Sequence, residues 1–325
     1  MRKEVREVKH YWYVSSSKNG WQNLAMDEWF LDTLSPEDMI LYFYVNENAV
    51  IIGKNQNPWK ECDLAAMERD KVQLVRRITG GGAVYHDAGN LNFSFITGKD
   101  QYDVEKQLGV ILQAVRSFSI PCDFSGRNDL LSDGRKFSGN AFCARGDLRQ
   151  HHGTLLLSSD LGKLSGYLQP DPRKLKAKGV SSVRSRVCNL GIAPEDMLRA
   201  IRRAYEAVYG EVTDLTVTAE QMAQVTPYFE KQSSWDWRMG KTPAFDLELD
   251  ERFPWGGVQL LLTLRNGTVD TAQVYTDSMD TDLAEEIRKR LEGCRCSSDA
   301  MEQALMASPK EQLHDVAHYL AAQKL

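Results

Sequence analysis

The amino-acid sequence predicts an α+β (α/β) protein with a large first domain and a small second domain. Helical stripes of apolar residues alternate with short β-rich runs over most of the chain, which is typical of this class. With 325 residues, of which 42% are hydrophobic and 26% charged, the chain is long enough for one large or two medium domains. Near Pro243 the order changes to strands followed by helices, so we predict domains at 1–242 and 243–325.

In the first domain, the spacing of apolar residues and the turn residues between them predict the elements in order. Amphipathic helices are expected at 20–34, 104–118 and 195–209. Strands are expected at 40–45, 49–53, 73–78, 90–96, 136–142 and 153–157. Asn46, Glu47 and Asn48 separate the first two strands, which suggests that these two strands form a hairpin.

In the second domain, turn and cap residues are the clearest signals. Asn266 and Gly267 form the strongest two-residue hairpin signal in the chain, between strands expected at 258–264 and 269–275. A helix is expected at 282–291. Ser308, as an N-cap with a capping-box glutamate three residues later, predicts the start of the last helix.

Composition and charge exclude several classes of function. The net charge of -5 gives no overall basic field for nucleic acid, and no basic run is interleaved with aromatic residues. The longest apolar run, 39–45, is too short to span a bilayer, and residues 1–14 lack the apolar core of a signal peptide. The six cysteines are scattered without a CxxC pair, which argues against a disulfide framework or a zinc ribbon. We therefore expect a cytoplasmic protein that binds neither nucleic acid nor membrane.

The first candidate for chemistry is the stretch RRITGGGAVYHD, from Arg76 to Asp87. Three consecutive glycines are costly to order, so the backbone must need to be bare of side chains at this point. Backbone N–H groups could approach a phosphate here, and Arg76 or Arg77 could add charge. The alternative is a glycine-rich hairpin with surface arginines. Neither GxxxxGK[ST] nor a strand-turn-helix GxGxxG is present, so known phosphate fingerprints do not decide between the two.

Two further clusters carry cations. GRNDLLSDGRKFSGNA contains Lys136 at the start of an expected strand, where it could be a nucleophile, a fixed cation, or an edge-strand lysine that prevents aggregation. HHGTLLLSSDL is followed by KLKAKGVSSVRSRVCNL, whose basic stretch at 174–186 could close over an anion or be a solvated loop. Cys143 could be a nucleophile, although an ordinary free thiol is the simpler interpretation. The pair His314 and His318 echoes a zinc motif, but its glutamate and a third ligand are missing.

Taken together and in this order, the three clusters resemble the three signature blocks of the lipoate–protein ligase family. GWQNLAMDEWFL and IIGKNQNPWKE resemble the family's first helix and the strand-loop that follows its first hairpin, and ERFPWGGVQLLLTLRNGTV resembles the start of its small accessory domain. The resemblance spans almost the whole chain. It implies a large mixed-sheet catalytic domain of the kind shared with biotin ligases, followed by a small αβ C-terminal domain.

The resemblance also implies a two-step reaction. Lipoate and ATP, with Mg²⁺ assisting, would give lipoyl-AMP and pyrophosphate. The lipoyl group would then pass to a lysine of a carrier, either a lipoyl domain of a 2-oxoacid dehydrogenase complex or the glycine cleavage H protein. Metal ligands are not identified. The implied ATP and adenylate contacts are Arg77, Gly82, Ala83, Val84, Tyr85 and Lys136, with Lys178 and Arg184 in an adenylate loop. Lys136 would also contact the lipoate carbonyl.

Elementary chemistry agrees with this assignment, because attack of a carboxylate on a phosphate joins two anions and needs fixed positive charge. Phe137 and Cys188 depart from the family's usual residues, and Phe137 could reshape the acyl pocket, which leaves the acyl-chain preference open. The main alternative is an octanoyl or lipoyl transferase that uses Cys143 as an acyl-enzyme and no ATP. Biotin ligation and a binding protein that has lost catalysis are two further alternatives.

Overall fold

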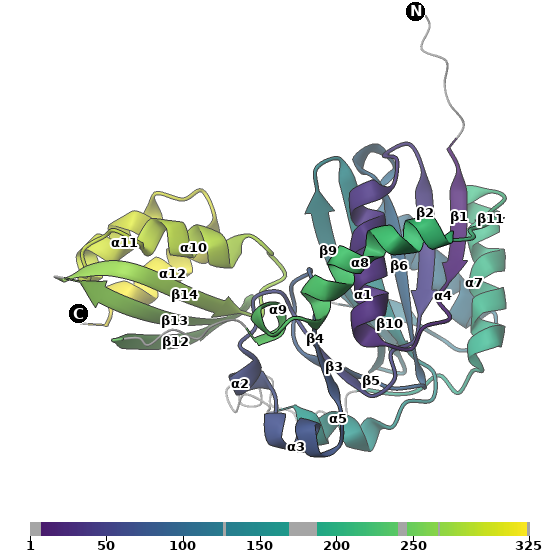
Figure 1. Cartoon of the computed structure of the whole chain (residues 1–325), viewed down its shortest axis with the longest axis horizontal. Helices are drawn as coiled ribbons and strands as arrows, with labels where there is room; N and C mark the ends of the chain where they lie inside the picture. Colours follow the sequence, from purple (N-terminus) through teal and green to yellow (C-terminus); the bar gives the residue numbers. More distant parts are fainter. Residues whose placement is uncertain (1–7, 126–127, 169–186, 240–245, 266, 324–325) are drawn as a thin grey trace, which may run out of the picture. The chain divides into compact units, whose positions relative to one another are not determined.

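The computed structural model describes residues 8–125, 128–168, 187–239, 246–265 and 267–323. In these ranges the chain forms two compact units (Figure 1). The first consists of Met1–Ile51, Cys62–Arg76 and Val84–Arg238, and the second of Ile52–Glu61, Arg77–Ala83 and Met239–Leu325. The second unit thus includes two short segments from the first half of the sequence. The predicted boundary at 242/243 falls among residues outside the described ranges, and it stays a prediction.

The first unit is built on a mixed sheet that has eight strands in the described part of the chain. Their order is β11-β1-β2-β6-β10-β9-β8-β7. The bounds are β1 His10–Val14, β2 Met39–Tyr44, β6 Asn90–Gly98, β7 Asp123–Ser125, β8 Asp129–Ser132, β9 Arg135–Arg145, β10 Leu148–Leu156 and β11 Thr213–Asp214. Strand β1 runs parallel to β2 and β11, whereas the pairs from β2 to β7 are antiparallel. The α+β class and the large mixed sheet are therefore confirmed.

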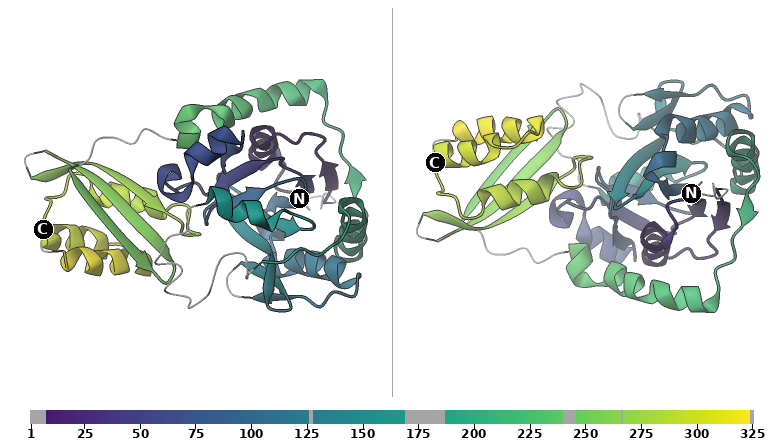
Figure 2. Two further views of the ribbon diagram at one scale, coloured as in Figure 1. Left: turned by 90° about the horizontal axis from the view of Figure 1, so that it is seen from below. Right: turned by 90° about the horizontal axis from the view of Figure 1, so that it is seen from above.

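Each face of this sheet has its own helical cover, because side chains alternate along a strand. Helices α4 (Val104–Arg116) and α7 (Pro194–Tyr209) share one apolar core with Phe43 and Phe93. On the opposite face Tyr42 packs on Phe30 of α1 (Gly20–Thr33), with ring centroids 5.5 Å apart. Helix α8 (Ala219–Ser233) packs across α1 (Figure 2). The three helices predicted for the first domain are confirmed as α1, α4 and α7. The prediction that α1 is amphipathic is wrong, because all its residues over 23–31 are buried.

A second, three-stranded sheet corrects one prediction. Its order is β4-β3-β5, with β3 at Ala49–Ile52, β4 at Gln73–Arg76 and β5 at Val84–His86. The predicted hairpin between strands 40–45 and 49–53 is therefore wrong. Both edges of β2 are already hydrogen-bonded, to β1 and to β6, so no edge of β2 is open to β3. The chain instead changes sheets at Asn46, whose buried amide contacts Asn23 and His86.

The second unit has its own antiparallel sheet, made of β12 (Leu247–Phe253), β13 (Gly256–Arg265) and β14 (Thr268–Thr276). One face is covered by α10 (Leu283–Leu291), α11 (Ser298–Met306) and α12 (Glu311–Ala321), as Figure 1 shows. The predicted strand pair on either side of Gly267 is confirmed as β13 and β14, and Gly267 has a φ of 77°.

The start of the last helix differs from the prediction. Lys310 is the N-cap residue of α12 and makes no side-chain cap hydrogen bond. The Ser308 hydroxyl donates instead to Glu286 of α10, 2.6 Å away. The Ser308 oxygen still accepts from the backbone N–H of Lys310 at 3.2 Å, but the helix begins only after Lys310, and the hydroxyl proton is used in the contact with α10.

Short elements complete the chain: α2 Pro58–Glu61, α3 Leu64–Arg69, η1 Lys99–Gln101, α5 Leu161–Tyr167 and α9 Trp235–Met239. Among the helices in the described ranges, none combines the length and the apolar character that crossing a bilayer requires.

Candidate functional site

The glycine loop begins where β4 ends, and Arg77 organises it. The Arg77 side chain is 7% exposed. Its Nη2 donates to the carbonyl oxygens of Gly80 (2.7 Å) and Gly82 (2.9 Å), and Nε lies 3.2 Å from the Gly80 oxygen. The guanidinium therefore holds the backbone of the loop in a curl around itself.

Each of the three glycines in the loop is suited to its position for a different physical reason. At Gly80 a Cβ would lie 2.4 Å from the carbonyl oxygen of Ser278, a backbone contact that leaves no room. Gly81 has a φ of 94°, which favours glycine. Gly82 has neither constraint, because a Cβ there would meet no described atom within 4 Å. Of the three, Gly82 is therefore the position where open space could admit a ligand.

Val84 and Tyr85 lie on β5, directly after the loop. Their backbones pair with Ile51 and Val50 of β3. The Tyr85 side chain is buried, and its hydroxyl donates to Asn48 Oδ1 at 3.0 Å. Burial, and then the nearby Asp87, raises the pKa of Tyr85 to about 12, so the phenol is neutral at physiological pH. The side chain of Tyr85 anchors the strand, which leaves the backbone as the part suited to a ligand.

Lys136 is the second residue of β9 and is held by a carboxylate. Its Nζ lies 2.7 Å from Oδ1 of Asp129 on β8, and 33% of the lysine side chain is exposed. Its aliphatic end crosses Gly139, where a Cβ would be only 2.8 Å from Nζ. An ion-paired ammonium with a defined position suits the role of fixed cation better than that of nucleophile.

Asp129 was not among the residues predicted from the sequence, although a signal for it existed. Asp133 and Gly134 form an Asp-Gly turn between β8 and β9, which is a hairpin signal of the same kind as the one in the second unit. The regular register of a two-residue hairpin would still not have predicted the contact between Asp129 and Lys136. Phe137 has no partner on β8, since Leu130 faces Ser138 and Leu131 faces Lys136. This irregularity sets the positions from which the two charges meet.

The chain on either side of the basic stretch at 174–186, up to residue 168 and from residue 187, is part of the described structure. Lys178 and Arg184 lie outside the described residues. The chain before the stretch forms a bridge between Leu168 and Cys62, and the chain after it forms a bridge between Val187 and Lys136. The amide of Cys188 also donates to the carbonyl oxygen of Lys136 at 2.9 Å. The chain thus returns from the basic stretch directly beside the candidate lysine.

The predicted residues are divided between the compact units. Arg77, Gly82 and Ala83 belong to the second unit. Val84, Tyr85 and Lys136 belong to the first.

Cys143, the candidate nucleophile of the alternative function, lies farther along β9. The residue opposite it on β10 is Gln150. Its Sγ is 3.8 Å from the Ala144 carbonyl oxygen. The neighbouring histidines have other contacts: His152 faces Asp27 at 3.4 Å, and His151 lies between two amide side chains.

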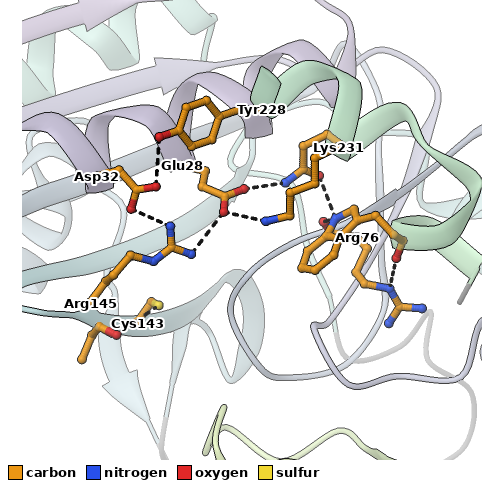
Figure 3. A network of polar contacts seen from close by, with 10 residues as sticks. Glu28, Asp32, Arg76, Cys143, Arg145, Tyr228 and Lys231 are labelled. Atoms are coloured by element: carbon orange, nitrogen blue, oxygen red, sulfur yellow. Dashed lines mark hydrogen bonds and ion pairs between the residues drawn. The ribbon is translucent and has the colours of Figure 1, made fainter. Parts of the chain in front are cut away.

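A network of charges ties α8 to α1 beside Cys143 (Figure 3). Glu28 of α1 is 4% exposed, and its Oε1 accepts from Arg145 at 3.1 Å and from Lys231 of α8 at 2.6 Å. Asp32, one turn later on α1, accepts from Arg145 and from the Tyr228 hydroxyl, at 2.6 Å and 3.1 Å. Because Glu28 is buried and receives two cations, this network fixes how α8 lies on the domain.

The same helix leads to a contact with the end of β4. Arg76 donates to the carbonyl oxygens of Trp237 and Arg238, both at 2.8 Å, and the Trp237 indole donates to the Arg76 carbonyl at 2.9 Å. Arg76 therefore anchors the chain just before residues 240–245 and is not a surface arginine.

Comparison with known proteins places these features in a family. Residues 19–201 match the model of the lipoyl protein ligase A/B catalytic domain, and residues 242–318 match that of the bacterial lipoate protein ligase C-terminus. The structure of P. falciparum LipL1 in complex with lipoate is 26% identical with a TM-score of 0.85, and the match covers 97% of this chain and 100% of that one.

Two further solved structures match about three quarters of the chain. One comes from an archaeal lipoylation system of Thermoplasma acidophilum, described as a bi-partite lipoate protein ligase and its E2 lipoyl domain. It is 27% identical with a TM-score of 0.64, and covers 74% of this chain and 99% of that one. The other is a lipoate-protein ligase A bound with ATP, which is 26% identical with a TM-score of 0.64 and covers 72% and 99%.

Proposed function

Because this chain belongs to the family of the lipoyl protein ligase A/B catalytic domain, we propose that it is an ATP-dependent lipoate–protein ligase. The observation that carries the proposal is Lys136, a partly exposed ammonium held in place by Asp129 on a rigid strand. Neighbouring structures bound with lipoate and with ATP support the choice of substrates.

In the first step, a carboxylate oxygen of lipoate attacks the α-phosphorus of Mg·ATP. The new O–P bond forms as the bond to the β-phosphate bridge breaks, which gives lipoyl-AMP and pyrophosphate. Two anions must approach each other, so a fixed cation lowers the barrier more than it stabilises the separated substrates. Lys136 supplies this cation. A single carboxylate contact needs only one of the three N–H donors of an ammonium, so Asp129 can hold Lys136 while substrate oxygens bind it.

We assign the nucleotide phosphates to the backbone of the glycine loop, with Gly82 as the point of approach. Arg77 acts by curling the loop, and Ala83, Val84 and Tyr85 contribute backbone beyond it. Lys178 and Arg184, outside the described residues, remain proposed contacts of the adenylate.

In the second step, the amine of a carrier lysine attacks the lipoyl carbonyl, an amide bond forms, and AMP leaves while the amine loses a proton. We propose that the carriers are lipoyl domains of 2-oxoacid dehydrogenase complexes and the glycine cleavage H protein. The lipoyl domain has support from the archaeal system described with its E2 lipoyl domain. We propose that this reaction takes place in the cytoplasm.

Isotope exchange between pyrophosphate and ATP tests the proposal directly. We expect exchange that depends on lipoate and needs no carrier, because adenylation is reversible before transfer. Cys143→Ser should retain both the exchange and the transfer to a purified lipoyl domain. The transfer is measured as the increase in the intact mass of that domain. The absence of exchange, combined with loss of transfer in Cys143→Ser, would establish the cysteine-dependent transferase instead.

Alanine substitutions at two neighbouring glycines should separate ligand contact from folding. Gly82→Ala is expected to raise the KM for ATP by about tenfold, equivalent to ~1.4 kcal/mol, because a methyl group enters the space proposed for a phosphate. Its thermal unfolding should not change. Gly80→Ala is the matched control: its Cβ meets the Ser278 backbone, so it should perturb the loop and lower stability as well. An unchanged KM in Gly82→Ala would contradict our placement of the nucleotide.

A further inference from the structure

A chain of buried polar side chains runs through the first unit and ends at Asp129, the partner of Lys136. It starts at Gln107 on α4, passes through His151 on β10 and Asn140 on β9, and reaches Asn128, the residue just before β8. Gln107 and His151 are fully buried, and Asn140 is 3% exposed. Apolar residues of similar size could fill these buried positions and would need no hydrogen-bond partners. The presence of polar side chains here therefore needs an explanation.

Asn128 and Asn140 lock two strands together. The backbone amide and the side-chain Nδ2 of Asn140 both donate to the carbonyl oxygen of Asn128, at 2.9 Å and 3.0 Å. In return, Nδ2 of Asn128 donates to the carbonyl oxygen of Asn140 at 2.9 Å. Asp129 is the next residue, and its backbone lies opposite Gly139. These bonds therefore fix the point from which the Asp129 carboxylate extends.

His151 sets the orientation of the Asn140 amide. Nδ2 of Asn140 donates to Asn128, so the atom of Asn140 that lies 3.0 Å from Nε2 of His151 is the acceptor Oδ1. Nε2 of His151 must therefore carry the proton. Burial, and then His152, lowers the pKa of His151 to about 3, so the ring is neutral and Nδ1 is an acceptor. Gln107 lies 3.0 Å from Nδ1 and can present its amide NH₂ there after a half-turn about its last bond.

Space is also reserved for this arrangement. A Cβ at Gly153 would lie 2.5 Å from Asn140 Oδ1 and 2.5 Å from the Phe93 ring. A Cβ at Gly139 would lie 2.8 Å from Lys136 Nζ. One glycine thus admits the amide in the middle of the chain, and the other admits the ammonium at its end.

We propose that Asn140 and His151 are positioning residues for Lys136: they fix Asn128, and through it the Asp129 carboxylate that holds the ammonium over Gly139. This inference rests on the proposed function, in which Lys136 must be a fixed cation. The physical advantage is preorganisation, since a cation that is already in place costs no reorganisation when charge develops.

A double-mutant cycle tests whether Asn140 acts through Lys136. The measurement is kcat for lipoate-dependent pyrophosphate–ATP exchange, divided by the number of competent sites, counted as lipoyl-AMP formed in one turnover. We expect Asn140→Ala to lower this kcat by about 10- to 100-fold, with the KM for ATP little changed. In a Lys136→Ala background the same change should cost less than about twofold, because there is no ammonium left to position.

His151 and Asp129 provide variants that do not depend on how well Asn140→Ala folds. His151→Leu should lower kcat per site like Asn140→Ala, and His151→Gln, which keeps an N–H donor, should recover most of it. Asp129→Asn changes a partly exposed residue, so folding should be unaffected, and its kcat should fall as well. Asp133→Asn, in the exposed turn of the same hairpin, is the matched control and should behave like the wild type.

The outcomes distinguish this proposal from the function on which it rests. If Lys136→Ala keeps full turnover, the lysine has no role to be positioned for, and both proposals fail. If Lys136→Ala is inactive while Asn140→Ala and Asp129→Asn keep the wild-type kcat per site, the ligase proposal stands and the positioning role is wrong. Equal effects of Asn140→Ala in both backgrounds would also overturn it, because they would indicate a purely structural residue.

Discussion

Lys136→Ala is expected to slow lipoate-dependent adenylation by about 10²–10³-fold, or ~3–4 kcal/mol of activation free energy, as measured by pyrophosphate–ATP exchange. The ammonium lies on strand β9, and a carboxylate fixes its position, at 2.7 Å from Asp129. Its removal leaves the charge of the attacking carboxylate and the α-phosphate uncompensated. The loss should appear mainly in kcat, since the charge concentrates in the transition state.

Lys99→Ala is the matched control for this variant. Lys99 has the same kind of ion pair, with Nζ 2.7 Å from Asp147, but it lies in the short helix η1 and 52% of its side chain is exposed. Exposed ion pairs contribute about 0–1 kcal/mol to stability, so both variants should unfold near the wild-type temperature. Only Lys136→Ala should lose activity. Full turnover in Lys136→Ala, or an equal loss in Lys99→Ala, would remove the lysine from the mechanism.

Gly153→Ala should be the most destabilising of the alanine substitutions considered, at about 1–3 kcal/mol. The new Cβ would lie 2.5 Å from the Phe93 ring, which is fully buried between neighbouring strands and cannot withdraw. It would also lie 2.5 Å from Asn140 Oδ1, so the buried polar side chains that connect Gln107 with Asn128 should be disturbed at the same time. Urea unfolding and thermal unfolding measure the loss of stability.

Another glycine provides a control, because the same change to alanine there should have the opposite effect on stability. Gly109 lies inside α4, and a Cβ there would meet no described atom within 4 Å. Alanine is favoured over glycine in a helix interior by about 0.5–1 kcal/mol, so Gly109→Ala should raise stability. An unchanged or raised unfolding midpoint in Gly153→Ala would contradict the reserved space at Gly153, whereas a lowered midpoint in Gly109→Ala would contradict only the argument for the helix.

Sequence pattern predicted the elements that depend on neighbours along the chain. The periodicity of α4 and α7, and the Asn-Gly signal between two β-rich runs, are local, and the two helices and the pairing of β13 with β14 were confirmed. The pairing of β3 could not be predicted in this way. Whether β2 has a free edge depends on β6, which lies some 50 residues further along, and both edges of β2 are occupied.

The residues proposed for the chemistry followed from motifs, but their physical roles did not. Arg77 was expected beside a phosphate, and its guanidinium curls the loop around Gly80 and Gly82. The glycine triplet was expected to admit a ligand as a whole. Gly80 is instead required by the Ser278 backbone, Gly81 by its φ of 94°, and Gly82 faces open space.

The sequence alone determined the class of fold, the family and the identity of the candidate lysine, because these depend on residue types in a fixed order along the chain. Only the tertiary structure decided which groups hold that lysine. Asp129, Asn140 and His151 come from different strands, and their contacts depend on strand register and on the irregularity at Phe137. A change of one residue in register turns a side chain to the other face of a sheet. These strands follow one another along the chain, but the turn signals between them do not reveal the irregularity at Phe137 that sets the register.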